Sequence, residues 1–145
     1  MIVEGWIKGE KVDILIDTGS SISLIGGETM KRIVDPKDIE AAEFDKIIAV
    51  NATETEVRGM VRQEITIGNY TAMAKLNILA EASYQILLGR DFMRENIQTI
   101  NCLTNEITLK NGEMVKASDP KNDPPVTQGE ESRKDVVGVC IINEK

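Results

Sequence analysis

The stretch I-L-I-D-T-G-S-S-I-S-L-I, which starts at Ile14, places one carboxylate, that of Asp17, inside a strongly apolar run. Burying an ionisable group is costly unless a partner hydrogen-bonds it or shares its charge. The Thr18, Gly19 and Ser20 that follow favour a turn, because hydroxyls bond nearby backbone groups and glycine tolerates left-handed conformations. By itself, D-T-G-S is more often a plain turn than a catalytic loop, so its context must decide.

The amino-acid composition excludes several kinds of catalytic and metal-binding site. The chain has no histidine, which excludes Ser-His and Cys-His nucleophile pairs. Its two cysteines, Cys102 and Cys140, have no second cysteine or histidine nearby that would suggest a metal site. We therefore expect no metal and no cofactor.

Charge and length limit the partners. A net charge of −7 argues against binding to nucleic acid and to anionic membranes, because both need clustered Lys and Arg. No stretch reaches the length of a membrane span, and the N-terminus lacks a basic segment followed by an apolar one. We expect one domain and an intracellular, reducing location.

The local patterns predict a mostly β domain over residues 1–117. Residues 21–25 alternate polar and apolar, which predicts a strand with one buried face, and Gly9-Glu10 is expected to form the first hairpin turn. A short helix is expected at residues 91–96, and residues 28–34 are expected to form either a short helix or an irregular segment. The other expected strands are residues 2–8, 11–16, 44–50, 55–67, 70–79, 85–89, 97–100, 106–109 and 113–116.

The C-terminal part has a different composition. Residues 118–134 contain one aliphatic residue and three of the four prolines, which predicts a disordered or linker-like tail from residue 118 to 145. Residues 136–142 are apolar again. They are compatible with a docking strand, with the start of a following region, or with a plain tail.

A second motif, I-L-L-G-R-D-F from Ile86, follows D-T-G-S in a position that fits another buried strand. With both motifs, residues 2–116 resemble the retropepsin-like aspartic proteases of retroviruses and long-terminal-repeat retrotransposons. The resemblance implies an all-β, small, closed, barrel-like acid-protease fold with one or two short helices. It also implies a homodimer, because one D-T-G in a chain this short supplies half of the site.

In such a dimer two Asp17 carboxylates would face each other and share one proton. The charged carboxylate would activate a water and the protonated one would polarise the scissile carbonyl of an extended polypeptide. The resemblance thus implies an aspartic endopeptidase that processes a retroelement polyprotein, in the cytoplasm or within retroelement particles.

The resemblance also implies roles for the loop residues. Thr18 would hydrogen-bond across to the partner's loop, and Gly19 would let the substrate backbone approach. Ser20 and Leu88 are expected at the substrate. The Ser20 hydroxyl is further expected to donate to the Asp17 carboxylate, which would favour its ionised form and shift the working range towards acid.

The hairpin tip at Asn51, Ala52 and Thr53 would be a flap that closes over the substrate. It lacks the glycine that many relatives carry, so either hinges such as Gly59 serve closure or the tip is stiffer. An ordinary exposed hairpin is the alternative.

In the second motif, Gly89 would let its strand pack tightly against the active-site loop, and Arg90 would bond near the dimer interface. Ser21 and Ile22 stand where an acidic pair can engage that arginine in viral relatives. The partner of Arg90 therefore stays open, and a surface arginine that caps a strand is the alternative.

Three interpretations of the whole chain remain. The first is the dimeric endopeptidase. The second is a retropepsin-like dimerisation or peptide-binding module with little or no catalysis. The third, an unrelated β domain in which D-T-G-S is a plain turn, requires the second motif to be a coincidence.

Overall fold

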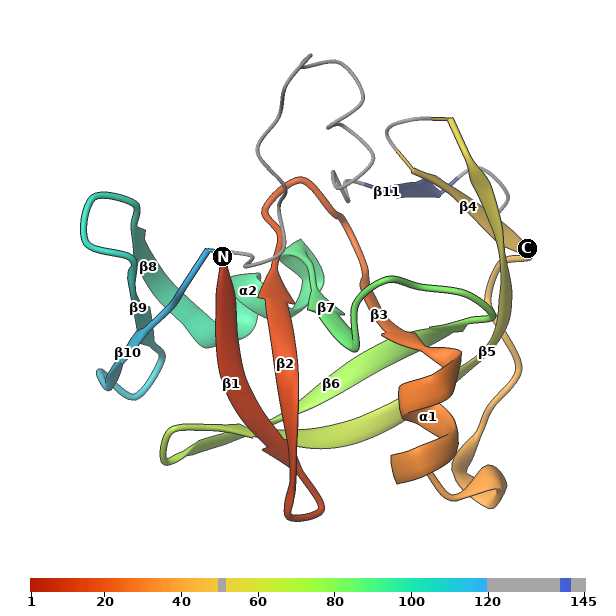
Figure 1. Cartoon of the computed structure of the whole chain (residues 1–145), viewed down its shortest axis with the longest axis horizontal. Helices are drawn as coiled ribbons and strands as arrows, with labels where there is room; N and C mark the ends of the chain where they lie inside the picture. The colour runs from red at the N-terminus through yellow and green to blue at the C-terminus, as the bar shows by residue number, and fades with distance from the viewer. Residues whose placement is uncertain (50–51, 120–138, 142–145) are drawn as a thin grey trace.

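The computed structural model describes residues 1–49, 52–119 and 139–141, and Figure 1 shows their arrangement around a β-barrel. The helices are α1 (Gly27–Ile33), the 3-10 helix η1 (Pro36–Asp38) and α2 (Arg90–Asn96). The strands are β1 (Ile2–Ile7), β2 (Glu10–Ile16), β3 (Ser23–Gly26), β4 (Lys46–Ala49), β5 (Glu54–Ile67), β6 (Tyr70–Leu79), β7 (Ile86–Leu88), β8 (Ile97–Asn101), β9 (Glu106–Leu109), β10 (Met114–Lys116) and β11 (Val139–Ile141).

Six strands close the barrel in the order β1-β2-β7-β3-β6-β5, and the pairing of Trp6 with Thr66 joins β1 back to β5. Closure removes the free edges that an open sheet of this size would expose. Its interior is aliphatic, with Ile7, Ile14 and Leu76 fully buried. The prediction of an all-β, barrel-like fold with one or two short helices is confirmed, and the two are α1 and α2.

The first hairpin turns one residue earlier than expected. Lys8 and Gly9 both have positive φ angles, 53° and 81°, and Ile7 pairs with Glu10. A two-residue turn with both central residues at positive φ matches the twist of the flanking strands. The turn is therefore Lys8-Gly9, and Glu10 already belongs to β2.

Strand β3 lies between β7, to which it is antiparallel, and β6, to which it is parallel. All four of its residues are buried, Ser23 included. The prediction of one exposed face was wrong here, because the barrel and its covering elements enclose both faces of this central strand.

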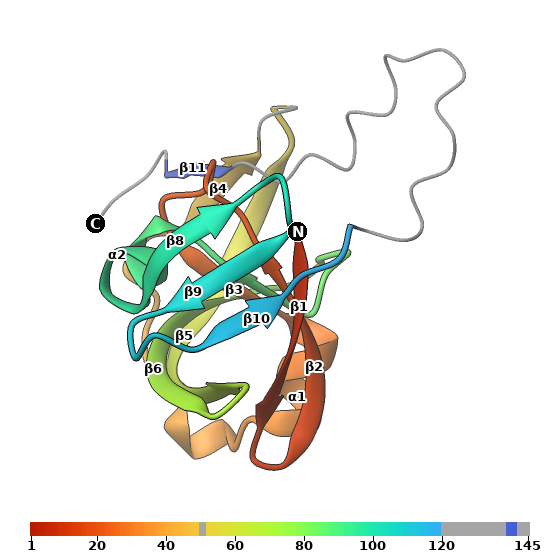
Figure 2. The same cartoon turned by 90° about the vertical axis from the view of Figure 1, so that its left-hand side faces the viewer.

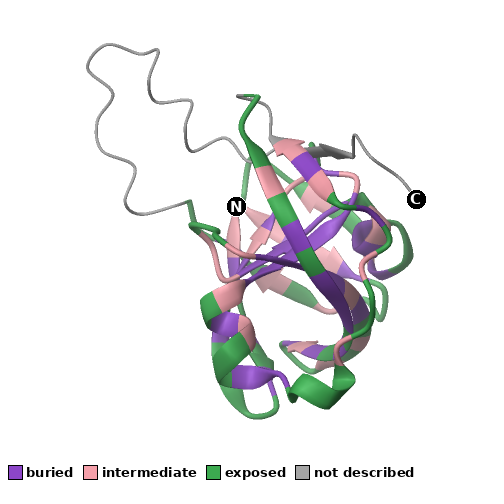
Figure 3. Ribbon diagram, turned by 90° about the vertical axis from the view of Figure 1, so that its right-hand side faces the viewer, coloured by how far each residue is buried: buried purple, intermediate pink, exposed green. Residues whose placement is uncertain are grey.

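The longest strands, β5 and β6, form a hairpin of the barrel, and the first residues of β5 extend beyond it to pair with β4. Along β5, buried and exposed residues alternate for much of its length, as Figure 3 shows. A register shift between Val57 and Gly59 separates the barrel part of β5 from the part that pairs with β4. The β4–β5 hairpin is the candidate flap.

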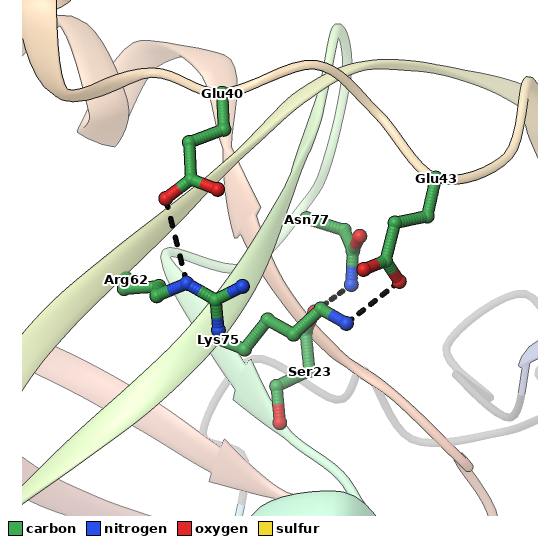
Figure 4. Close-up of polar contacts among 6 residues, drawn as sticks. All are labelled: Ser23, Glu40, Glu43, Arg62, Lys75 and Asn77. Carbon is green, nitrogen blue, oxygen red and sulfur yellow. Dashed lines mark hydrogen bonds and ion pairs between the residues drawn. The ribbon is translucent and has the colours of Figure 1, made fainter.

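The segment that leads into β4 is fastened to the barrel. Glu40 pairs with Arg62 at 3.4 Å, and Glu43 pairs with Lys75 at 2.6 Å (Figure 4). Glu40 also forms a backbone bridge with Met60. Exposed ion pairs contribute little stability each. Together with the bridge, they define where the candidate flap starts.

A second, three-stranded sheet has the order β10-β9-β8 and follows α2 (Figure 2). After β10, the backbone of Ser118 exchanges hydrogen bonds with that of Ile2 at 2.7 and 2.8 Å. These hydrogen bonds connect Ser118, at the start of the predicted tail, to the first strand of the barrel. Residues 120–138 lie outside the described residues, so a linker there stays a prediction.

Of the apolar segment at residues 136–142, the structure describes β11, which pairs antiparallel with β4. This agrees with the docking-strand alternative. Within the described part of the chain, no helix has the length and apolar character needed to cross a membrane.

The closed aliphatic core yields a direct stability test. Leu76 is fully buried on β6, whereas Leu103 in the β8–β9 turn is 96% exposed. We expect Leu76→Ala to lower the free energy of unfolding by about 2–5 kcal/mol, because it removes buried methyl groups and leaves a cavity. Leu103→Ala should change it by less than about 0.5 kcal/mol. Urea denaturation of both variants checks this, and equal effects would contradict the placement of Leu76.

Candidate active site

The D-T-G-S turn follows β2 directly. Strand β2 pairs in parallel with β7, with Ile14 opposite Ile86 and Ile16 opposite Leu88. The Asp17 amide then donates to the Leu88 carbonyl at 3.0 Å, which continues this pairing into the loop. The apolar residues before Asp17 are therefore barrel residues, and they fix the position at which the carboxylate leaves the sheet.

The two oxygens of the Asp17 carboxylate have different surroundings. Oδ1 accepts a hydrogen bond from the Gly19 amide at 2.9 Å, and the Ser20 amide donates to the Asp17 carbonyl at 3.1 Å. Oδ2 is buried and has no hydrogen-bond partner among the described residues. A buried carboxylate oxygen without a donor is unfavourable, so this atom marks an incomplete site.

Thr18 and Gly19 lie at the exposed side of the loop, where a second molecule can reach them. The predicted hydrogen bond from Thr18 to a partner loop involves a second chain and stays a prediction. Gly19 donates its amide to the Asp17 carboxylate.

Ser20 differs from the expectation. Its side chain is fully buried, and its hydroxyl donates to the Ile22 carbonyl at 2.7 Å. The predictions that Ser20 contacts substrate and donates to Asp17 were therefore wrong for this protomer. The hydroxyl instead stabilises the loop backbone, and the expected basis for an acid shift in the working range is absent.

Leu88 also differs from the expectation. Its side chain is fully buried in the barrel core as part of β7. A side chain that no solvent reaches does not contact a substrate, so the predicted substrate contact was wrong. Leu88 serves the site through its carbonyl, which accepts from the Asp17 amide.

Gly89 allows the second motif to approach the loop very closely. A Cβ atom at this position would lie 2.3 Å from the Ile22 carbonyl oxygen and 2.7 Å from the Ser20 carbonyl oxygen. Both atoms belong to backbone and have little freedom to move. The tight packing predicted for Gly89 is thus present, and only glycine fits.

Arg90 binds the same loop. Its amide donates to the Ser20 carbonyl at 2.8 Å, and its exposed guanidinium approaches the Thr18 carbonyl, with an Nη1 to oxygen distance of 3.4 Å. In the protomer Arg90 therefore contacts the turn itself. Its predicted place at a dimer interface stays a prediction.

Sequence reasoning missed a buried network behind the loop. The Ser23 hydroxyl accepts from the Gly89 amide at 3.0 Å and donates to Asp91 Oδ1 at 2.7 Å. The Asn77 side-chain amide donates to the Ser23 carbonyl at 3.0 Å (Figure 4). The pattern of residues 21–25 placed Ser23 at the surface, so no local signal pointed to this role.

The candidate flap carries the remaining predicted residues. Ala52 and Thr53 are exposed, and Ala52 has a positive φ of 71°, a conformation that favours glycine. Asn51 lies outside the described residues. Gly59, the suggested hinge, lies at the register shift in β5, where a Cβ would come within 2.9 Å of the Ile39 side chain. Substrate contact by the tip stays a prediction.

Tyr84 is a further residue of the site that the sequence did not single out. Burial raises the pKa of its phenol well above the ordinary value, and the nearby charge of Asp17 raises it further. It packs beside the buried cluster that contains Ile22, Ile47 and Leu87. Tyr84 therefore places a neutral, half-buried ring near the carboxylate.

Comparison with known proteins agrees with this geometry. Residues 3–95 match the family described as "gag-polyprotein putative aspartyl protease". The match covers more than half of the chain and includes both motifs, so the chain belongs to this aspartyl protease family. No curated protein sequence matches the chain significantly.

Solved structures show the same fold. The retroviral protease-like domain of Ddi1 from Leishmania major has a TM-score of 0.70 and 18% identity, over 85% of this chain and 96% of that one. The EIAV protease in complex with the inhibitor HBY-793 has a TM-score of 0.51 and 15% identity, over 65% of this chain and 85% of that one. The barrel is thus a retropepsin fold, as the two motifs predicted.

The buried Ser20 hydroxyl yields the first test of the site. We expect Ser20→Ala to lower the free energy of unfolding by about 1–3 kcal/mol, because it removes a buried hydrogen bond to the Ile22 carbonyl. The neighbouring, half-buried Ser21 provides the control, and Ser21→Ala should stay within about 0.5 kcal/mol. Urea denaturation measures the free energy of unfolding of both variants. A Ser20→Ala variant as stable as wild type would contradict the hydrogen bond from Ser20 to the Ile22 carbonyl.

The raised pKa of Tyr84 yields a test in alkali. The neutral phenol is favoured in the folded chain, so its stabilising effect is complete below the unfolded pKa of about 10 and is lost as the pH rises further. Wild type should therefore lose stability above about pH 10 by an amount that Tyr84→Phe does not lose. The control variant Tyr70→Phe, in which Tyr84 is intact, should lose stability above about pH 10 as wild type does. Unfolding curves between pH 8 and 12 decide this, and superimposable wild-type and Tyr84→Phe profiles would exclude it.

Proposed function

We propose that this protein is an aspartic endopeptidase whose active site forms from the D-T-G-S loops of two copies of the chain. The observation that supports it is the Asp17 carboxylate, in which one oxygen is fixed by the Gly19 amide and the other is buried without a partner among the described residues. A protonated carboxyl of a second Asp17 is a donor suited to that oxygen. Membership of an aspartyl protease family supports the same chemistry.

Two such carboxyl groups side by side cannot both ionise cheaply, so they hold one proton between them. The ionised one removes a proton from a water, whose oxygen attacks the carbonyl carbon of the peptide bond. The protonated one gives its proton to the carbonyl oxygen as the tetrahedral intermediate forms. Proton transfer to the nitrogen then lets the C–N bond break and releases an amine and a carboxylic acid.

We locate the contact with the second chain from the edge strands that are unpaired in the protomer. Ile2 already pairs with Ser118 and β11 with β4, so both terminal segments are engaged within the protomer. Strands β8 and β10 are the two edges of the three-stranded sheet, and each pairs with β9 alone among the described strands. Strand β8 is the edge connected to the active-site loop. It begins directly after α2, whose first residue, Arg90, bonds the loop. We place the contact between copies at this edge of β8.

An extended polypeptide is the substrate that this fold accommodates best, because such a segment can bind as an added strand with pockets for alternate side chains. The exposed tip residues Ala52 and Thr53 belong to the hairpin that would cover it. The family description names the gag polyprotein. We therefore propose a retroelement polyprotein as the substrate, cleaved in the cytoplasm or within retroelement particles.

The direct test compares Asp17→Asn with a matched variant on the same strand. Asp13 on β2 is exposed, so Asp13→Asn removes an equal charge outside the site. With a peptide library at mildly acidic pH, we expect Asp17→Asn to lose about 10²–10⁴-fold in kcat/KM and Asp13→Asn to retain wild-type activity. Thermal unfolding verifies that both variants fold.

Mixing experiments test the shared site. A fivefold excess of Asp17→Asn chain should suppress wild-type cleavage, since most wild-type chains would then have a partner without the second carboxylate, whereas the same excess of Asp13→Asn should not. Sedimentation of the same samples measures the dimer. Cleavage that survives Asp17→Asn would contradict the mechanism, and a well-folded dimer that binds peptides without cleaving them would favour a peptide-binding module.

A further inference from the structure

The outer edge of the candidate flap is covered by the chain's own C-terminal segment. Strand β11 pairs antiparallel with β4, with Val139 opposite Ala49, Cys140 opposite Ile48 and Ile141 opposite Ile47. On its other edge β4 pairs with β5. In the eight-stranded sheet β11 is the last strand, so without it the edge of β4 would be open.

This edge lies beside the Asp17 loop. Ile47 of β4 belongs to the same buried cluster as Ile22, which follows the D-T-G-S turn, and Tyr84 packs against that cluster. Figures 1 and 2, viewed at right angles, both show β11 next to the loop that connects β2 and β3. The backbone of β11 therefore runs between the candidate flap and the catalytic loop.

We propose that β11 occupies the place of the substrate backbone, so that the chain carries its own competitive, strand-forming inhibitor. This deepens the proposed function and rests on it. A polypeptide substrate binds by adding a strand to an available sheet edge. The edge of β4 beside the loop between β2 and β3 is such an edge, and β11 already fills it.

The extent of β11 suits a removable strand. It comprises three residues and, among the described strands, pairs with β4 only. Being covalently joined to the domain, it competes at an effective concentration on the order of millimolar. A strand that fills the site in about nine molecules of ten lowers the apparent affinity for another strand about tenfold.

The experiment uses full-length chains in the Asp17→Asn background, so that no probe is cleaved. The probe is a fluorescein-labelled peptide with the sequence of residues 136–145, V-V-G-V-C-I-I-N-E-K, kept under reducing conditions. Val139→Pro with Ile141→Pro, and separately Cys140→Pro, remove strand amides from β11. Ser132→Pro, outside β11, is the matched control. Fluorescence anisotropy then measures the affinity of each chain for the probe.

We expect the chain with intact β11, and the Ser132→Pro control, to bind the probe at least about tenfold more weakly than the better of the two β11 variants. In the catalytically intact background the same β11 variant should lower KM for peptide substrates with kcat unchanged, as removal of a competitor requires. Equal probe affinities in all chains would overturn the proposal.

These outcomes separate this inference from the proposed function. Asp17-dependent cleavage with an unchanged KM and unchanged probe affinity would leave the endopeptidase intact and exclude β11 as its inhibitor. Tighter probe binding in the β11 variant without cleavage by any chain would retain the strand site and reject the endopeptidase. If β11 only stiffened the flap, both proline variants would lower thermal stability and leave probe affinity unchanged, which would also reject the inhibitor.

Discussion

The half-satisfied carboxylate of Asp17 is the constraint on which the site depends. One oxygen has a backbone donor two residues away, and the other is shut off from water with no donor from the described residues. Such an arrangement is unfavourable in an isolated protomer. The backbone bonds of the loop hold the carboxylate in this position, and in the proposed dimer the carboxyl group of a second Asp17 would supply the missing donor.

Those backbone bonds come from elements far apart in the sequence. Strand β7 holds the loop at Leu88, and the turn into α2 holds it at Gly89 and Arg90 through the Ser20 carbonyl and the Ser23 hydroxyl. A Cβ atom on Gly89 would lie only 2.3 Å from the Ile22 carbonyl oxygen, which shows how little space separates the two segments. The two motifs are thus one structural unit, and their apolar flanks are the strands that bring them together.

The sequence predicted the elements well where alternation or turn chemistry is local. Strands β6 and β9 have the predicted bounds, and both helices lie within a residue of their predicted positions. The predicted exposure or contacts of Ser23, Ser20 and Leu88 were wrong. A motif identifies the residues that form a site, but it does not determine which side of the backbone each side chain faces. The Trp6–Thr66 closure and the pairing of β11 with β4 join distant segments and have no local signature.

The edge of β4 has to satisfy opposing requirements. Under the proposed function it would have to be unpaired to receive an extended polypeptide, yet an unpaired edge recruits strands from other molecules and promotes aggregation. Within the barrel this risk is absent, because its six strands close on themselves. In the proposed inhibition a short strand from the same chain would resolve this conflict at β4. It would satisfy the edge amides when no substrate is present and, because it pairs over only three residues, would yield to a longer strand that reaches further along the flap and the loop.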